Sequence, residues 1–447
     1  MRVISVNNKM FSLILVSALF FPVVALPYDF KFSGRADYTL GGNNDLDFNK
    51  STEESSYFRT FRVKLDEEVS LPHGFDLAAE VQINYNEGEK GNPYSSFNTN
   101  DDNFKVRKAY WKWKSQGLNV EIAGGFQSLK LPSVTFGNPL FEGHTNALNI
   151  NAASPDKLYG QFFLAYPLQN DTRMPKARSA LIAGAIMGII GENFDLIPYF
   201  ASAYLKHQTD SVFDWASAPN DDYSYMLGGG LASKYKFADN FAAMLDLIIA
   251  DTNNTGPHHY ENKGYFSAIL LEHQIYSSII GLFGWYSSGN SMKLQNHNDY
   301  GLLPTVGAET SFAPTRLAFK GDAANGRDSA LSDTGAGTAG FGLHLKEIYS
   351  FENLRHVVRL AYITGTSVRQ GEGTPAAVIT QSPAKKRGEP GIMTNKDHAV
   401  EFDLDSIFDI TDYLKAALNF AYIFSGFSDK EYDTDIYDIE FSLSYIF

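Results

Sequence analysis

Charged residues recur at alternate positions in this sequence, and they are its best candidates for acting on a solute. Basic residues do so early in the chain and acidic residues near its end. Successive side chains of a β-strand point to opposite faces, so residues at alternate positions share one face. The basic candidates are Lys31, Arg35, Arg62, Lys64, Lys108 and Lys112, and the acidic ones are Glu401, Asp403, Asp438 and Glu440.

If these faces line an aqueous path, opposed charges would set its ion selectivity. The plainer alternative is a solvated wall, which could account for most of the charges.

Other residue patterns give weak indications of chemistry. The chain has no Cys. His258, His259 and Glu261 could ligate a metal, but adjacent His side chains tend to diverge. Residues 335–340 match G-x-G-x-x-G but lead into an alternating segment instead of a helix, which favours a flexible loop over a dinucleotide site. We therefore expect no enzyme, no metal and no cofactor.

The element that must position these charges is a β-strand with one apolar face. Residues 435–447, DIYDIEFSLSYIF, place an apolar residue at every second position from Tyr437 to Phe447. Similar alternation recurs along the chain, for example near residues 75–85, 118–127 and 413–424. The sequence shows no helical period that could cover so many apolar faces, which argues against a soluble sandwich.

The N-terminus indicates export. Arg2 and Lys9 precede a short apolar run, and Val23, Val24 and Ala25 offer a small-residue cleavage site. We predict a signal peptide over residues 1–25 and a single domain over residues 26–447. The net charge is −14, so we expect no binding to nucleic acid.

The connections alternate in length, which predicts a transmembrane antiparallel β-barrel of 16–18 strands. Short turns such as residues 71–74 alternate with long polar loops such as residues 291–337. Short periplasmic turns and long extracellular loops are typical of outer-membrane barrels. The best count is 18; the weakest predicted strand is 146–153, and losing a hairpin would give 16.

One long connection, residues 128–145, is too apolar for a free surface loop. We expect it to fold into the barrel, where it would bury Leu131, Val134, Phe136 and Phe141. This placement would put Glu142 and His144 in the lumen.

Three stretches resemble the homotrimeric outer-membrane porins of Gram-negative bacteria. They are residues 106–137, residues 302–322, and residues 356–367 and 392–410 continuing to the terminal strand. This resemblance implies a homotrimer of barrels in the outer membrane, with an inward loop. It also implies passive diffusion of small hydrophilic solutes and ions. The terminal Phe441, Tyr445 and Phe447 resemble the signal by which the barrel-assembly machinery recognises such chains.

Two other functions stay open. Residues 291–337 are long enough to narrow the pore, as in a substrate-selective channel, and a non-conducting scaffold or adhesin would use the loops as binding sites. The negative net charge slightly favours cations. The basic side chains could outweigh it locally, because distant charges are screened beyond about 8–10 Å at physiological ionic strength.

Overall fold

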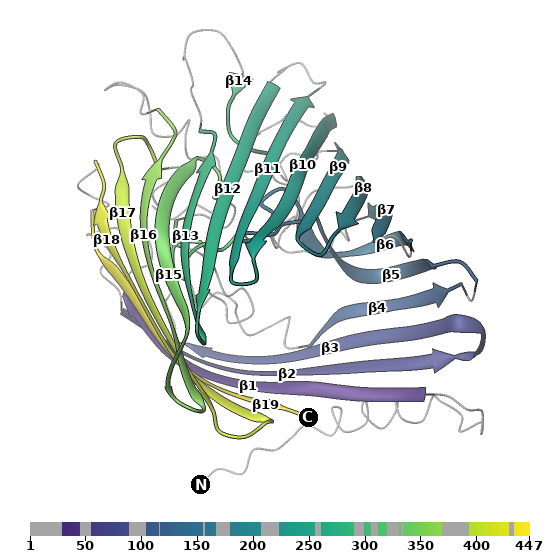
Figure 1. Cartoon of the computed structure of the whole chain (residues 1–447), viewed down its shortest axis with the longest axis horizontal. Coiled ribbons are helices and arrows are strands. Elements are labelled where there is room, and N and C mark those ends of the chain that lie inside the picture. The colour runs from purple at the N-terminus through teal and green to yellow at the C-terminus, as the bar shows by residue number, and fades with distance from the viewer. Residues whose placement is uncertain are drawn as a thin grey trace.

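The computed structural model is almost entirely β-strand (Figure 1). It describes residues 29–44, 55–88, 104–115, 117–154, 157–166, 179–206, 223–254, 261–289, 299–304, 312–319, 330–331, 335–368, 393–428 and 433–447. The predicted signal peptide and both histidines of the weak metal motif lie outside these residues. No helix in the described part of the chain is long and apolar enough to cross a membrane.

The first ten strands are β1 (Asp29–Asn44), β2 (Ser55–Leu71), β3 (Phe75–Gly88), β4 (Phe104–Lys114), β5 (Val120–Lys130), β6 (Glu142–Ala153), β7 (Leu158–Tyr166), β8 (Ser179–Ile190), β9 (Phe194–Lys206) and β10 (Tyr223–Ala238). The others are β11 (Phe241–Asn254), β12 (Glu261–Ile275), β13 (Ser278–Ser287), β14 (Asp299–Tyr300), β15 (Thr338–Phe351), β16 (Leu354–Gly365), β17 (His398–Asp409), β18 (Leu414–Gly426) and β19 (Ile436–Ile446).

Eighteen of these strands form a closed antiparallel barrel, which confirms the predicted fold and the best strand count. The two-residue β14 is additional and pairs in parallel with β12. Closure comes from β1 and β19, which pair from Arg35 opposite Ile446 to Asn43 opposite Asp438. The last residue completes the seam, because Phe447 and Gly34 exchange two backbone hydrogen bonds of 2.8 and 3.0 Å. No edge is left at this junction.

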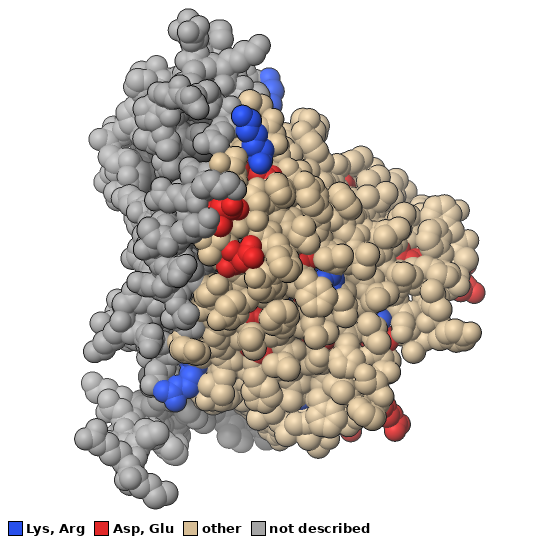
Figure 2. Space-filling view, turned by 90° about the vertical axis from the view of Figure 1, so that its left-hand side faces the viewer, with Lys and Arg blue, Asp and Glu red and all other residues tan. Residues whose placement is uncertain are grey.

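The outer face of the barrel is apolar and the inner face is mixed. On β19, Ile439, Phe441 and Tyr445 are exposed outward, whereas Asp438 and Glu440, at the alternate positions on either side of Ile439, are buried. The described part of the outer surface in Figure 2 carries few charged side chains. This is the alternation expected of a strand with lipid on one side and a lumen on the other.

Candidate functional site: the barrel lumen

Two segments fold into the lumen, and both are held by wall carboxylates. The first is the connection between β5 and β6, residues 131–141, which we call the inner loop. The second is residues 312–319, between β14 and β15, which we call the inner strap. Leu131, Phe141 and Phe312 are each at most 2% exposed, so both segments are packed rather than free.

The inner loop is fixed by Asp246 on β11. This carboxylate accepts hydrogen bonds from Ser133 Oγ at 2.6 Å and from Thr135 Oγ1 at 2.5 Å. It also accepts from the backbone nitrogens of Val134 and Thr135, both at 3.1 Å. Asn138 adds a bond of 2.7 Å to the hydroxyl of Tyr199 on β9. These contacts hold residues 131–141 against the inner wall, within the longer connection, residues 128–145, that was expected to fold inward.

The inner strap is fixed in the same way by the acidic residues near the end of the chain. Glu401 on β17 accepts from Thr315 Oγ1 at 2.6 Å and from the backbone nitrogens of Leu317 and Ala318 at 2.5 and 3.0 Å. Asp403 accepts from the backbone nitrogen of Arg316 at 3.0 Å. The sequence predicted acidic side chains on this inner face but gave no sign that a segment almost ninety residues earlier would cover them.

Arg316 is the charge that the strap brings to this acidic face. Its guanidinium pairs with Glu440 of β19 and lies 3.5 Å from Asp405. Arg359 of β16 reaches the same Asp405 at 2.7 Å. The acidic wall, which we define as Glu401, Asp403, Asp405, Asp438 and Glu440, is at most 8% exposed throughout.

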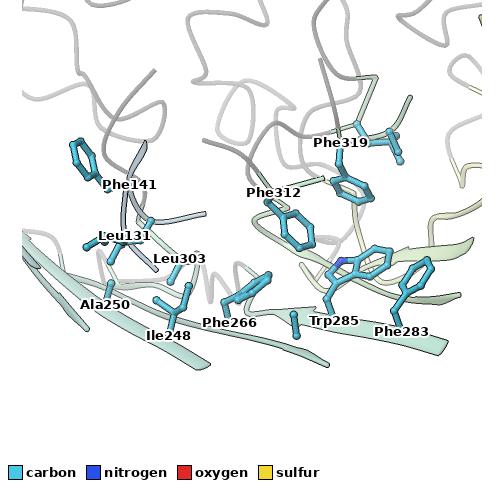
Figure 3. Packing of buried hydrophobic residues seen from close by; sticks show 14 of the residues in the cluster. Leu131, Phe141, Ile248, Ala250, Phe266, Phe283, Trp285, Leu303, Phe312 and Phe319 are labelled. Atoms are coloured by element: carbon cyan, nitrogen blue, oxygen red, sulfur yellow. The ribbon is translucent and has the colours of Figure 1, made fainter. Parts of the chain in front are cut away.

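An aromatic cluster joins the two inward segments to each other and to the wall (Figure 3). The ring of Phe312 lies 5.1 Å from that of Phe266 on β12 and 5.9 Å from that of Trp285 on β13. Phe319 packs edge-on against Trp285 at 5.3 Å. The nitrogen of Ala313 donates to the carbonyl of Phe136 in the inner loop at 2.8 Å. The loop and the strap therefore form one packed layer over the wall from β11 to β19.

The opposite wall, from β1 to β4, carries the basic side chains. Arg62 lies 3.1 Å from Asp37, Lys64 lies 4.0 Å from Glu80, and Lys108 also pairs with Glu80. Arg35 contacts Asp37 as well. Lys112 forms a separate cluster toward the short turns, where it lies 3.1 Å from Glu68 and 3.3 Å from Asp76. Lys31 shares the inner face of β1 and stands opposite Glu68.

Arg107 is a further basic residue on this wall that the sequence reasoning missed. The pairing of β3 with β4 shifts between Glu80 and Val81, so both Arg107 and Lys108 turn toward the lumen. A β-bulge re-aims side chains in this way. The signal in the sequence is the spacing of the outward apolar residues, which changes from two to three between Val106 and Ala109. We call Arg35, Arg62, Lys64, Arg107 and Lys108 the basic ladder.

The structure does not place Glu142 and His144 in the lumen, contrary to the sequence prediction. The strand β6 begins at Glu142, so these side chains share the outer face with Leu148, which is 42% exposed. The inward positions between them and below them are Gly143, Thr145 and Ala147, all buried.

Solved structures show the same fold, although sequence comparison gives no relative. No protein-family model and no curated protein sequence matches the chain. A BenF-like porin from Pseudomonas fluorescens Pf-5 superposes with a TM-score of 0.58 at 10% identity, covering 94% of this chain and 98% of that one. Pseudomonas aeruginosa OpdK, solved with vanillate, gives 0.54 at 13% identity over 94% and 98% of the chains. OccK2 (OpdF) from the same species, solved in complex with glucuronate, gives 0.56 at 11% identity over 94% and 98%. These likenesses establish for this chain the fold of a porin.

Proposed function

We propose that this protein is an outer-membrane channel that lets small hydrophilic solutes diffuse through a water-filled lumen and prefers anions. The fold supports the channel, since barrels of 16–18 strands leave an aqueous path. Export through a signal peptide over residues 1–25 and insertion by the barrel-assembly machinery belong to the same proposal.

The observation that carries the anion preference is the unequal exposure of the two charged walls. The side chains of Arg35, Arg62, Lys64 and Lys108 are 14% to 52% exposed. On the acidic wall, the side chains of Asp403, Glu440 and Asp405 are 0%, 5% and 12% exposed, and the inner strap contacts each of them. Charges within a Debye length, about 8 Å at physiological ionic strength, act most strongly on a passing ion. The exposed ladder therefore outweighs the negative net charge, which reverses the slight preference for cations inferred from the sequence.

We further propose that the channel is selective rather than a wide general pore. Two inward segments occupy part of the lumen, which supports a narrowed path. Two proteins of the same fold were solved with vanillate and with glucuronate, both carboxylates. A guanidinium or ammonium group pairs well with a carboxylate, so small organic carboxylates are the solutes that we expect to pass fastest.

The test is the reversal potential of single channels in a salt gradient. Replacing Arg35, Arg62, Lys64 and Lys108 together with Gln should shift it toward cations. Because that variant leaves Asp37 and Glu80 without these partners, the single change Lys64→Gln provides a milder test that keeps both carboxylates paired.

Lys112→Gln is the matched control, because Lys112 lies in the separate cluster with Glu68 and Asp76. Reversal potentials equal to the wild type in both ladder variants, with both proteins folded, would show that the ladder does not line the solute path. Current that saturates with glucuronate or vanillate, but not with a neutral sugar of similar size, would establish selectivity. A folded barrel that passes no current would favour a scaffold instead.

A further inference from the structure

The packed layer formed by the inner loop and the inner strap has a carboxylate anchor near each of its two ends. At one end, Asp246 of β11 accepts from backbone nitrogens of residues 133–137. At the other end, Glu401 of β17 accepts from backbone nitrogens of residues 315–318. Five strand spacings separate β11 from β17, because β12, β13, β15 and β16 lie between them. Neighbouring strands are about 4.8 Å apart, so the two anchors are about 24 Å apart along the wall.

Between the two anchors, the packed layer rests on aromatic rings. Figure 3 shows Phe312 and Phe319 of the strap above the rings that rise from the wall, those of Phe266, Trp285 and Phe283. The rings of Phe312 and Phe319 lie 5.5 Å apart, so the strap presents them to the wall side by side. Burial of apolar surface is non-directional and stabilises such contacts in proportion to the area removed from water. The centre of the layer is therefore stabilised mainly by the cover that each ring gives to the others.

The inner loop and the inner strap meet at Phe136, in the loop. Its ring lies edge-on to Phe283 of the wall at 5.1 Å and edge-on to Phe312 of the strap at 6.5 Å. Its carbonyl accepts from the nitrogen of Ala313 at 2.8 Å. One loop residue therefore contacts both the wall and the strap, and we call Phe136, Phe312 and Ala313 the joint.

Undocking of one segment alone would break the joint and expose apolar surface. If the strap left by itself, Phe312 would no longer cover Phe266 and Trp285, which are 1% and 5% exposed in the docked state. The carbonyl of Phe136 would also lose its donor. If the loop left by itself, Phe312 and Phe283 would both lose the ring of Phe136. Exposure of apolar surface to water is unfavourable, so states with one segment docked are disfavoured against states with both docked or both released.

We propose that the inner loop and the inner strap act as one gate, which docks on the wall and leaves it as a unit. Loosening the anchor at Asp246 would then release the strap, and loosening the anchor at Glu401 would release the inner loop. The two anchors bias the same two-state element, which is the physical basis of coupling between distant sites. Such coupling is reciprocal, because each anchor must affect the other by the same factor. The proposal depends on contacts within the packed layer and not on the solute that passes.

The experiment measures backbone amide exchange in the full chain, purified in detergent, at the anchor that is not mutated. Exchange of a protected amide reports how often its segment opens. The variant Glu401→Gln should speed exchange over residues 133–137 of the inner loop at least tenfold, although these amides bond to Asp246. Asp246→Asn should speed exchange over residues 315–318 of the strap at least tenfold. The control Glu121→Gln also changes a lumen carboxylate, but one that contacts neither segment, and it should match the wild type.

A change at the joint tests what carries the coupling. Phe136→Leu keeps an apolar side chain but removes the ring that contacts Phe312 and Phe283. In this background, Glu401→Gln should speed exchange over residues 133–137 less than threefold. Wild-type exchange rates at the opposite anchor in both anchor variants would overturn the proposal. An effect in one direction only would also overturn it, because coupling is reciprocal, and so would a tenfold effect that persists in Phe136→Leu.

Single-channel current gives an independent measurement of the same gate. If the two segments move as a unit, Glu401→Gln, Asp246→Asn and the combined variant should all show one and the same larger current level. Segments that move independently would give a different level in each single variant and a third level in the combined one, which would overturn the proposal. A folded barrel that passes no current would contradict the proposed channel instead, and the exchange measurement would still decide whether the loop and the strap are coupled.

Discussion

Neutralising Glu401 should release the inner strap. In the variant Glu401→Gln, either orientation of the new amide turns an NH₂ group toward a donor of the strap. In the wild type, one carboxylate oxygen of Glu401 accepts from the nitrogen of Leu317. The other accepts from the hydroxyl of Thr315 and the nitrogen of Ala318. The side chain keeps its volume, so the change acts on hydrogen bonding and charge alone.

The size of the effect follows from those three bonds. Hydrogen bonds to a charged group contribute about 1.5–3 kcal/mol each. Part of this is offset, because the variant no longer buries a charge, and the burial of an ion costs several kcal/mol. We therefore expect a net loss of about 2–4 kcal/mol in the docking of the strap. Since 1.4 kcal/mol changes an equilibrium tenfold, the ratio of docked to undocked states should fall by roughly 30- to 1000-fold.

Single-channel recording is the suitable assay, because an undocked strap changes the cross-section of the lumen. The variant should alternate between the wild-type current and a larger one, whereas the wild type stays at the lower level. Glu121→Gln is the matched control: Glu121 also faces the lumen but contacts Asn151 and Lys114 rather than the strap. Traces of Glu401→Gln that match those of the wild type, from a correctly folded barrel, would refute the assignment of Glu401 as the anchor.

Three further predictions concern the inner loop, the closure of the barrel between β1 and β19, and the contacts of Asp397 just before β17. Asp246→Asn should loosen the inner loop, with faster amide exchange over residues 133–137 as the measure, and unchanged exchange there would contradict its role. Deletion of Phe447, which closes the seam against Gly34, should sharply lower the amount of folded barrel in the outer membrane; normal levels would rule this out. Burial raises the pKa of Asp397, but hydrogen bonds from Thr394 and Ser428 outweigh it and hold this pKa below its usual range. The hydrogen bonds that Asp397 accepts from Thr394 and Ser428 should therefore be at full strength above about pH 4. They should be lost as the pH falls through the depressed pKa of Asp397. In the wild type, the amide proton of Ser428 should exchange faster once these hydrogen bonds are lost at low pH. In Asp397→Asn, no such transition with pH should be seen.

The fold was predictable because most strands face two different solvents. Alternation along residues 435–447 identifies both the strand and its inner face, and β19 has that orientation. The prediction weakened in the middle of the chain for a physical reason. On β8 the inward Ile182 and Ile186 are buried, in the same apolar cluster as Phe141 of the inner loop, so the inner face there is as apolar as the outer one. Alternation of polarity disappears where an inward segment packs apolar side chains against the wall, as on β8, but persists on β17, where carboxylates hold the inner strap.

The site was less predictable, because its properties depend on contacts between segments far apart in the chain. The spacing of the acidic residues predicts that they share the inner face, and in the structure they are buried beneath or beside the inner strap. Its role was not evident, because nothing near Glu401 in the sequence points to Thr315, Leu317 or Ala318. Arg107 was missed because a single bulge inverts the alternation.

The covering of the acidic wall explains why net charge is a poor guide to this lumen. A carboxylate that accepts several hydrogen bonds from the strap still counts as one negative charge in the composition. In the folded barrel, however, it faces Arg316 and backbone N–H groups instead of water, so its field is largely compensated before it reaches the lumen. On the basic ladder, Arg35, Lys64 and Lys108 contact Asp37 or Glu80 but keep 31% to 52% of their side-chain surface exposed. The same acidic residues that make the sequence negative therefore hold the strap in place, and under the proposed function the charge presented to a solute comes mainly from the opposite wall.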